Sequence, residues 1–122
     1  MKSTRIIADT VLTCDKDFAV ISPGAVDFDD DCITWVGTPE EKPVEPEREI
    51  KNVGGILMPG LVNAHAHTPM TLVRGAGDGL PLWRWLSEAM WPREGRMSPE
   101  DVLWGMTLGS AEMLLSGVTT SC

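Results

Sequence analysis

The sequence predicts an α/β fold in which a strand-rich first half is followed by one parallel βαβ unit. Short β-prone segments alternate with turn-forming residues up to about position 37. A helix with clear start and stop signals, at residues 98–116, lies between strand-like segments at 56–62 and 118–122. Two strands joined by such a crossover are expected to be parallel, with a right-handed connection.

The first half is predicted to form a β-meander. Its strands are expected at residues 5–13, 18–21, 25–28 and 32–37, and Ser22-Pro23-Gly24 supplies a turn. The run Asp29-Asp30-Asp31 is interpreted as a hairpin tip, because it lacks the spaced oxygen ligands and closing glutamate of an EF-hand calcium loop. Residues 38–51, rich in proline and glutamate, are expected to form a surface connection.

Charge and cysteine content limit the classes of partner. The net charge is −8, and the acidic first half is interpreted as a solvated surface that favours solubility. No basic patch and no apolar run of about 20 residues is present, so we expect neither a nucleic-acid nor a membrane partner. Cys14, Cys32 and Cys122 are widely spaced and predict reduced thiols in a cytoplasmic protein, the first two buried in strands.

The only two histidines, His65 and His67, follow the apolar run 56–62, which is expected to be a strand buried on both faces. In an extended chain they share one face with Asn63. Two such imidazoles can bind one metal ion at about 2.0–2.1 Å each. The alternative is a pair of polar surface side chains. We predict that His65 and His67 are two ligands of one metal ion. Zinc is the first choice, and iron and manganese are alternatives.

Two helices are expected after the histidines. Residues 68–81 contain several glycines and predict a long functional loop. A short helix is expected at residues 82–90, with Trp83, Leu86 and Met90 on one face, and Pro92 is expected to end it. The longer helix is expected to begin at Ser98 and to end before Gly117. Its predicted packing stripe contains Leu103, Met106, Ser110, Met113 and Leu114.

The run PGLVNAHAHTPMTLVRG resembles the first barrel strand of the amidohydrolase superfamily, with its Pro-Gly and His-x-His elements. More narrowly, the His-Ala-His-Thr-Pro-Met-Thr-Leu run and Trp91-Pro92-Arg93-Glu94 resemble the methylthioadenosine/S-adenosylhomocysteine deaminases. Triazine chlorohydrolases and guanine deaminases are similar relatives. The likeness covers essentially the whole chain and is most specific over residues 57–120.

This resemblance implies the start of a metal-dependent (β/α)8 TIM barrel preceded by part of a small β-sandwich, or composite, domain. Residues 1–57 would supply N-terminal sandwich strands, and residues 58–122 the first βα unit or units of the barrel. A barrel takes about 250 residues, so the 122 residues are expected to be an N-terminal portion of a larger protein.

The resemblance also implies a hydrolytic deaminase of adenine nucleosides that uses a divalent metal, with zinc first. His65 and His67 would be metal ligands, and the Glu94 carboxylate would accept hydrogen bonds from the ribose hydroxyls. The other ligands and the acid/base residues are expected beyond residue 122. Residues 1–122 alone are therefore expected to be inactive.

Several alternatives stay open. Glu94 could be a solvated residue in the turn before the second helix. The enzyme could be a chlorohydrolase or a guanine deaminase of the same superfamily, or the chain could be a non-catalytic fragment. We expect a small-molecule substrate. A homo-oligomer is one of the assembly states considered for the full-length protein.

Overall fold

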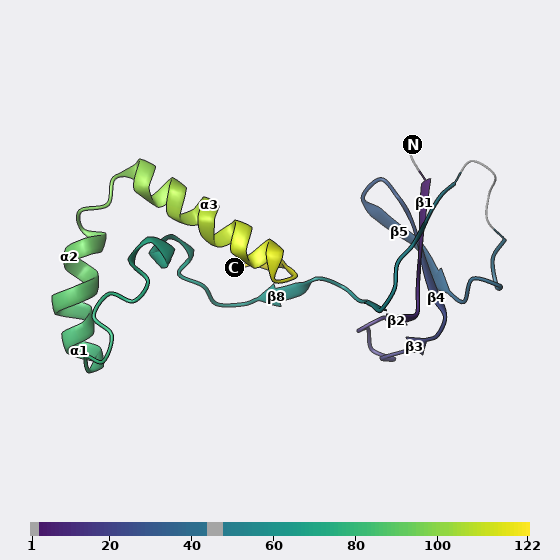
Figure 1. Cartoon of the computed structure of the whole chain (residues 1–122), viewed down its shortest axis with the longest axis horizontal. Helices are drawn as coiled ribbons and strands as arrows, with labels where there is room; N and C mark the ends of the chain where they lie inside the picture. Colours follow the sequence, from purple (N-terminus) through teal and green to yellow (C-terminus); the bar gives the residue numbers. More distant parts are fainter. Residues whose placement is uncertain (1–2, 44–47) are drawn as a thin grey trace. The chain divides into compact units, whose positions relative to one another are not determined.

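The structure, a computed structural model, describes residues 3–43 and 48–122. The chain divides into two compact units, Met1–Pro59 and Gly60–Cys122 (Figure 1). The first unit is built from strands, and the second contains helices and a strand pair, so the fold is mixed α/β. None of the helices in the described residues is long and apolar enough to cross a membrane.

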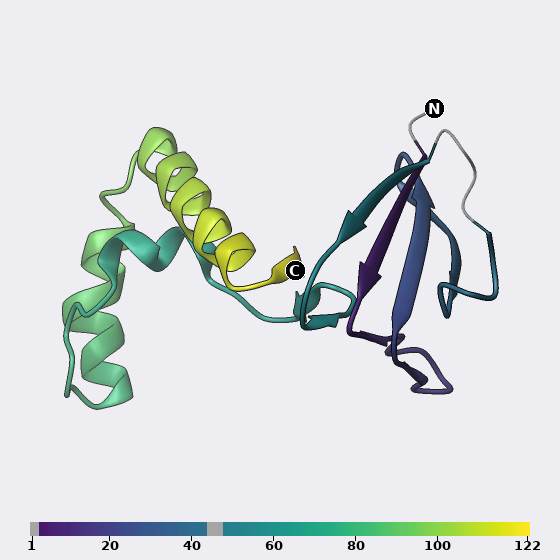
Figure 2. The ribbon, with the colours of Figure 1, turned by 45° about the vertical axis from the view of Figure 1, so that its right-hand side comes forward.

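Two small sheets make up the first unit (Figure 2). One has the strand order β5-β4-β1-β6 and the other β3-β2-β7. Their bounds are β1 Ser3–Ala8, β2 Thr10–Leu12, β3 Val20–Ile21, β4 Gly24–Asp29, β5 Cys32–Gly37, β6 Glu49–Asn52 and β7 Ile56–Leu57. Two antiparallel hairpins of the predicted meander, β2–β3 and β4–β5, are confirmed. The continuous meander was wrong, because β3 and β4 belong to different sheets and β4 pairs with β1. The strand expected at 5–13 is divided, because β1 and β2 belong to different sheets.

The expectation of a surface connection over residues 38–51 was wrong at its end. Residues 49–52 form β6, which pairs in parallel with β1. All four of its residues are exposed. Its sequence, EIKN, contains a single apolar residue, so no apolar alternation marks the strand. Its backbone pairs with the edge of β1 from Thr4–Glu49 to Ile7–Asn52. Positions 44–47 of the expected connection lie outside the described residues.

The acidic turn is a hairpin tip, as predicted. Asp29 on β4 lies opposite Cys32 on β5, so Asp30 and Asp31 form the two-residue turn. Asp30 has a φ angle of 52°, a left-handed conformation that aspartate adopts more readily than most residues.

A buried ion cluster lies in the first unit, where the charge pattern had predicted only solvated acids. Arg5 and Asp27 are both 0% exposed. The Arg5 Nε and Nη2 atoms donate to the two Asp27 carboxylate oxygens at 2.6 and 2.9 Å. The Lys42 Nζ and Arg48 Nη1 atoms lie 3.2 and 3.6 Å from Asp27 Oδ2. The hydrogen bond from Arg5 holds the Asp27 pKa below its usual value. Asp27 therefore contradicts the prediction of a solvated first half.

The three cysteines are free thiols, and all are exposed. The prediction that Cys14 and Cys32 are buried was wrong. Cys14 follows β2 in a left-handed conformation outside any strand. Cys32 begins β5 at the exposed end of that strand.

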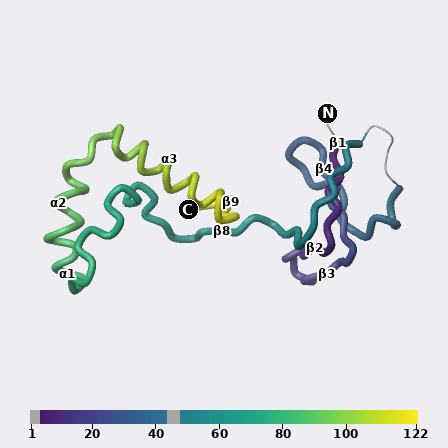
Figure 3. The backbone as a smooth tube through the Cα atoms, viewed as in Figure 1, coloured from purple at the N-terminus to yellow at the C-terminus, as the bar shows by residue number. Residues whose placement is uncertain are grey.

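In the second unit, β8 (Leu61–Asn63) and β9 (Val118–Ser121) pair in parallel, which confirms the predicted βαβ arrangement (Figure 3). The expectation of one strand over 56–62, buried on both faces, was wrong. Residues 56–57 pair within the first unit as β7, and Leu61 and Val62 are 49% and 66% exposed. Within the described chain, β9 is the only strand paired with β8, so much of the apolar surface of β8 stays open.

The predicted loop at 68–81 begins as a 3₁₀ helix, η1 (Thr68–Val73). The short helix then continues past Pro92 as α1 (Leu82–Arg84), a π-helical segment η2 (Trp85–Met90) and α2 (Trp91–Glu94). The Trp91 N–H bonds to the Leu86 carbonyl five residues earlier, which widens the turn just before the proline. A wider turn accommodates the ring that would otherwise clash with the preceding turn. Pro92 therefore does not end the helix.

The predicted face of this helix was also wrong. Trp83 is 73% exposed, whereas Ala89 and Met90 are buried. The Trp85 indole is half-buried and donates to the Ala76 carbonyl at 3.0 Å. The π-helical turn changes the angular spacing of side chains, so a regular α-helical spacing does not identify the packed face.

The long helix α3 (Pro99–Leu115) begins and ends as predicted. The Ser98 Oγ atom accepts the Asp101 N–H at 3.1 Å, and Asp101 Oδ2 accepts the Ser98 N–H at 2.8 Å. The Ser98 N–H and the Ser98 hydroxyl both donate to Asp101 Oδ2, and these two bonds lower the Asp101 pKa. Gly117 follows the helix with a φ angle of 82°.

The predicted packing stripe of α3 was wrong in most of its members. Leu103, Met106 and Leu114 are exposed, and the two buried residues are Gly105 and Gly109. A Cβ atom on Gly105 would lie 2.5 Å from the Pro69 carbonyl oxygen, and η1 packs directly on this face. The packed face of α3 is therefore defined by two glycines, which have no side chain, and not by a stripe of apolar side chains.

We expect Gly105→Ala to destabilise the protein although alanine favours helices. The added methyl group meets backbone atoms of Pro69, and such overpacking costs about 1–3 kcal/mol, more than the roughly 1 kcal/mol gained in helix propensity. Urea denaturation measures the effect, with exposed Ser110→Ala as the control on the same helix. A Gly105→Ala variant more stable than the native protein would contradict the packing argument.

Candidate metal centre

His65 and His67 lie just beyond the end of β8 and not in the extended strand that was predicted. His65 lies in a bend, and His67 lies in the irregular segment that leads into η1. Their side chains nevertheless converge. The two Nε2 atoms are 3.2 Å apart, and the ring centroids are 5.2 Å apart with an angle of 56° between the ring planes. Both residues are exposed. Strand β8 therefore delivers two imidazoles side by side at its carboxyl end.

The spacing of the two nitrogens fits a shared metal ion. Two imidazole nitrogens bound to a tetrahedral zinc at 2.0–2.1 Å are about 3.3–3.4 Å apart. The observed 3.2 Å also suits a hydrogen bond between one protonated and one unprotonated ring nitrogen. Among the described residues, no group of three or more His, Cys, Asp and Glu side chains is arranged to hold a metal.

Each histidine has its own anchor. The Asn63 Oδ1 atom accepts the backbone N–H of His65 at 3.1 Å. His67 is the N-cap residue of η1, and its carbonyl accepts the Met70 N–H at 2.9 Å. Because η1 packs on Gly105 and Gly109 of α3, the backbone of His67 is tied to that helix.

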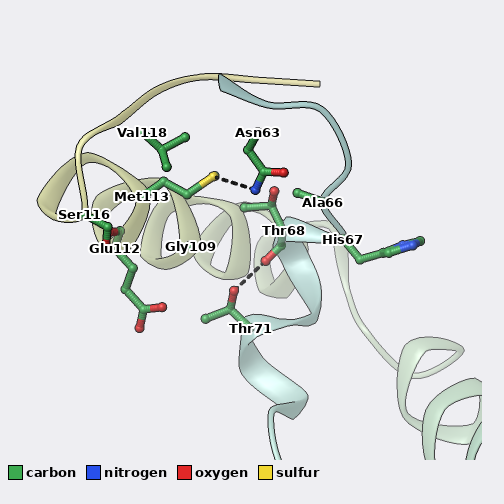
Figure 4. Close-up of a pocket in the computed structure, with 10 residues that line it drawn as sticks. All are labelled: Asn63, Ala66, His67, Thr68, Thr71, Gly109, Glu112, Met113, Ser116 and Val118. Carbon is green, nitrogen blue, oxygen red and sulfur yellow. Dashed lines mark hydrogen bonds between the residues drawn. The ribbon is translucent and has the colours of Figure 1, made fainter. Parts of the chain in front are cut away.

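A cavity of about 340 Å³ lies between β8, η1 and the second half of α3 (Figure 4). Asn63 and Met113 point toward each other across it, with 3.8 Å between Asn63 Nδ2 and Met113 Sδ. The His67 ring points away from α3. The lining residues are Asn63, Ala66, His67, Thr68, Thr71, Gly109, Glu112, Met113, Ser116 and Val118.

Sequence reasoning missed the contribution of α3 to this region. Glu112 pairs with Arg74, which follows η1, and this contact raises the Arg74 pKa. A signal was available, because Gly105, Gly109 and Met113 are spaced four residues apart and lie near one face of a helix. That spacing identifies the face on which Glu112 and Met113 approach the histidine segment.

Glu94 is the last residue of α2, and it is exposed. Its backbone carbonyl accepts the Met97 N–H at 3.1 Å. Within residues 3–43 and 48–122, no hydrogen bond or ion pair joins Glu94 to His65 or His67. The structure therefore brings the two histidines together and leaves Glu94 in a separate segment.

The sequence profile of the amidohydrolase family matches residues 56–122. A fold with paired histidines after a parallel strand, together with this match, defines the class: the chain belongs to the amidohydrolase family. The resemblance noted from the motifs is confirmed.

The chain is 44% identical over 121 residues to a 5-methylthioadenosine/S-adenosylhomocysteine deaminase of Desulforamulus reducens, covering 98% of this chain and 28% of the relative. A deaminase of the same name from Pelotomaculum thermopropionicum is 41% identical, with the same coverages. The chain thus spans about 28% of the length of these relatives.

Solved structures give a consistent result. An adenosine deaminase from Xanthomonas campestris with bound zinc superposes with a TM-score of 0.88 at 38% identity, over 98% of this chain and 28% of that one. Guanine deaminase of E. coli superposes with a TM-score of 0.77 at 23% identity, over 99% and 30% of the two chains. The second likeness shows the fold alone.

Proposed function

We propose that these residues are the N-terminal portion of a metal-dependent aminohydrolase that releases ammonia from an adenine nucleoside, of the 5′-methylthioadenosine/S-adenosylhomocysteine type. The observation that carries the proposal is the 3.2 Å separation of the His65 and His67 Nε2 atoms directly after β8. Metal and catalytic groups in barrel enzymes lie at the carboxyl ends of the parallel strands. The names of the relatives support the reaction and the substrate class. Ammonia release from 5′-methylthioadenosine by the full-length enzyme tests the proposal.

His65 and His67 would hold the metal through Nε2, with zinc as the first choice and iron or manganese as alternatives. When bound, such an ion lowers the pKa of a water molecule and polarises the substrate. A hydrolytic site takes three protein ligands and an open position, so two imidazoles alone fall short of it. The 122 residues by themselves are therefore proposed to be inactive.

The proposed architecture is the start of a (β/α)8 barrel at residues 58–122, preceded by part of a β-sandwich at residues 1–57. The parallel pairing of β8 and β9 supports the barrel. Support for the sandwich comes from an apolar cavity of about 340 Å³ in the first unit, which further strands would cover. We propose a cytoplasmic enzyme with a small-molecule substrate. A homo-oligomer is the assembly considered for its full-length chain.

Glu94 is proposed to bind the two ribose hydroxyls of the substrate. A carboxylate offers two acceptor oxygens to two adjacent donors, and these charge-assisted bonds are stronger than neutral ones. Its exposure at the end of α2 leaves the carboxylate accessible.

We expect Glu94→Gln to lower kcat/KM for 5′-methylthioadenosine by on the order of tenfold to a hundredfold. Each hydrogen bond to a charged group contributes roughly 1.5–3 kcal/mol, and the substitution keeps the shape but removes the charge. The 2′,3′-dideoxy analogue has no diol, so its kcat/KM should change much less.

Glu100→Gln, another exposed glutamate, is the matched control and should leave both substrates unaffected. Equal losses on the two substrates in Glu94→Gln would mean that Glu94 is structural. A guanine deaminase or a triazine chlorohydrolase would then be the better assignment.

A further inference from the structure

Asn63 connects three parts of the second unit at the point where β8 ends. Its backbone carbonyl accepts the Cys122 N–H at 3.0 Å, which ties it to the end of β9. Its side-chain Oδ1 accepts the His65 backbone N–H at 3.1 Å, and its Nδ2 donates to Met113 Sδ on α3 at 3.8 Å. One planar carboxamide thus contacts both the histidine segment and the crossover helix. Figure 4 shows its contact with Met113 on that helix.

We infer that Asn63 is a positioning residue that sets where the His65 imidazole meets that of His67; this inference rests on the proposed function of the pair as metal ligands. The chain bends directly after Asn63, so strand pairing does not fix residues 64–67. The bond from the His65 N–H to Asn63 Oδ1 closes this bend. It therefore fixes the backbone from which the His65 ring projects.

The two histidines are held independently, which makes the role of Asn63 separable. His67 is fixed through η1, whose backbone packs on Gly105 and Gly109 of α3. Loss of the Asn63 acceptor leaves that anchor intact. His65 should then shift relative to a fixed His67, and the 3.2 Å convergence of the two Nε2 atoms should loosen.

The chemistry of the side chain predicts which replacements work. Aspartate keeps an acceptor oxygen for the His65 N–H at nearly the same position. Leucine keeps the size but has no acceptor. The contact with Met113 Sδ is a weak one, because a thioether is a poor acceptor. The acceptor for His65 should matter more than the donor to Met113.

The test measures zinc affinity of the full-length protein by competition with a chromophoric chelator. Asn63→Leu should weaken Zn²⁺ binding by about 10–100-fold, the usual range for residues that orient a metal ligand. Asn63→Asp should restore nearly native affinity. Met113→Leu, which removes only the sulfur acceptor, is the control and should also bind nearly as well as the native protein. The visible absorption spectrum of the Co²⁺ form should change in Asn63→Leu and stay native-like in Asn63→Asp.

Native Zn²⁺ affinity in Asn63→Leu would overturn the inference, and so would equal weakening in Asn63→Leu and Asn63→Asp. If Asn63→Leu does not fold, Asn63→Ala replaces it, and unchanged affinity in that variant has the same meaning. Retention of zinc by His65→Ala would instead contradict the proposed function. The two failures are therefore distinguishable.

Discussion

His65→Ala and His67→Ala in the full-length protein should each lose the proposed divalent metal and the proposed deaminase activity. Each substitution removes one of the two nitrogens that lie 3.2 Å apart. Mutation of a residue that only orients a metal ligand typically lowers metal affinity or activity 10–100-fold. Removal of a ligand itself should therefore lower metal affinity more than about a hundredfold. Metal content per protein chain, measured by mass spectrometry, and ammonia release from 5′-methylthioadenosine give the two readouts.

An exposed thiol can also bind zinc, so a cysteine variant is the appropriate control. Cys14→Ser removes an exposed thiol in the first unit and should keep both metal and activity. Circular dichroism of each histidine variant separates loss of metal from loss of fold. Full metal occupancy in the double His65→Ala, His67→Ala variant would exclude the ligand assignment.

Asp27→Asn should destabilise the protein by on the order of 3–5 kcal/mol. The carboxylate is 0% exposed and accepts two hydrogen bonds from Arg5, with Lys42 and Arg48 nearby. An amide offers one acceptor oxygen and turns an N–H donor toward the guanidinium, and breaking a buried ion pair costs about this amount. The urea midpoint measures the effect. Exposed Asp17→Asn is the control and should change stability by less than about 0.5 kcal/mol.

The pH dependence of the same cluster follows from the lowered pKa of Asp27. The hydrogen bond from Arg5 is its main cause, and the folded pKa lies below the usual value of 3.8. A lowered folded pKa means that the stabilisation is present above pH 3.8 and is lost as the pH falls from there through the folded pKa. As the pH falls below 3.8, Asp27→Asn should therefore lose less stability than the native protein. An identical acid dependence in the two proteins would contradict this account.

The parts of the fold with local chemical signals could be predicted from the sequence. The Ser98 N-cap, the Gly117 C-terminus and the Asp30–Asp31 turn depend on residues a few positions apart. Parallel pairing of β8 with β9 followed from the general rule for strand–helix–strand units. The convergence of the two histidines was also predictable, although the bend that produces it was not.

The parts that depend on long-range packing could not be predicted. Arg5 and Asp27 are 22 positions apart, and nothing local distinguishes Asp27 from its solvated neighbours. β6 is held by backbone bonds to β1 and has no apolar pattern. Pro92 is a helix breaker by rule, and only the π-helical turn before it shows why the helix continues. The face of α3 was missed because glycine carries no hydrophobic signal.

The two glycines of α3 also determine the axial register of that helix. They are four residues apart, which corresponds to about 6 Å along the axis and slightly more than one turn. A shift of α3 by one residue toward its amino end would bring the side chains of Met106 and Ser110 over η1, where Gly105 and Gly109 now leave room only for backbone. The two glycines therefore disfavour this shifted position of the helix on η1. Because β9 follows α3 after a short turn, the same two glycines decide which residue of β9 lies opposite Asn63.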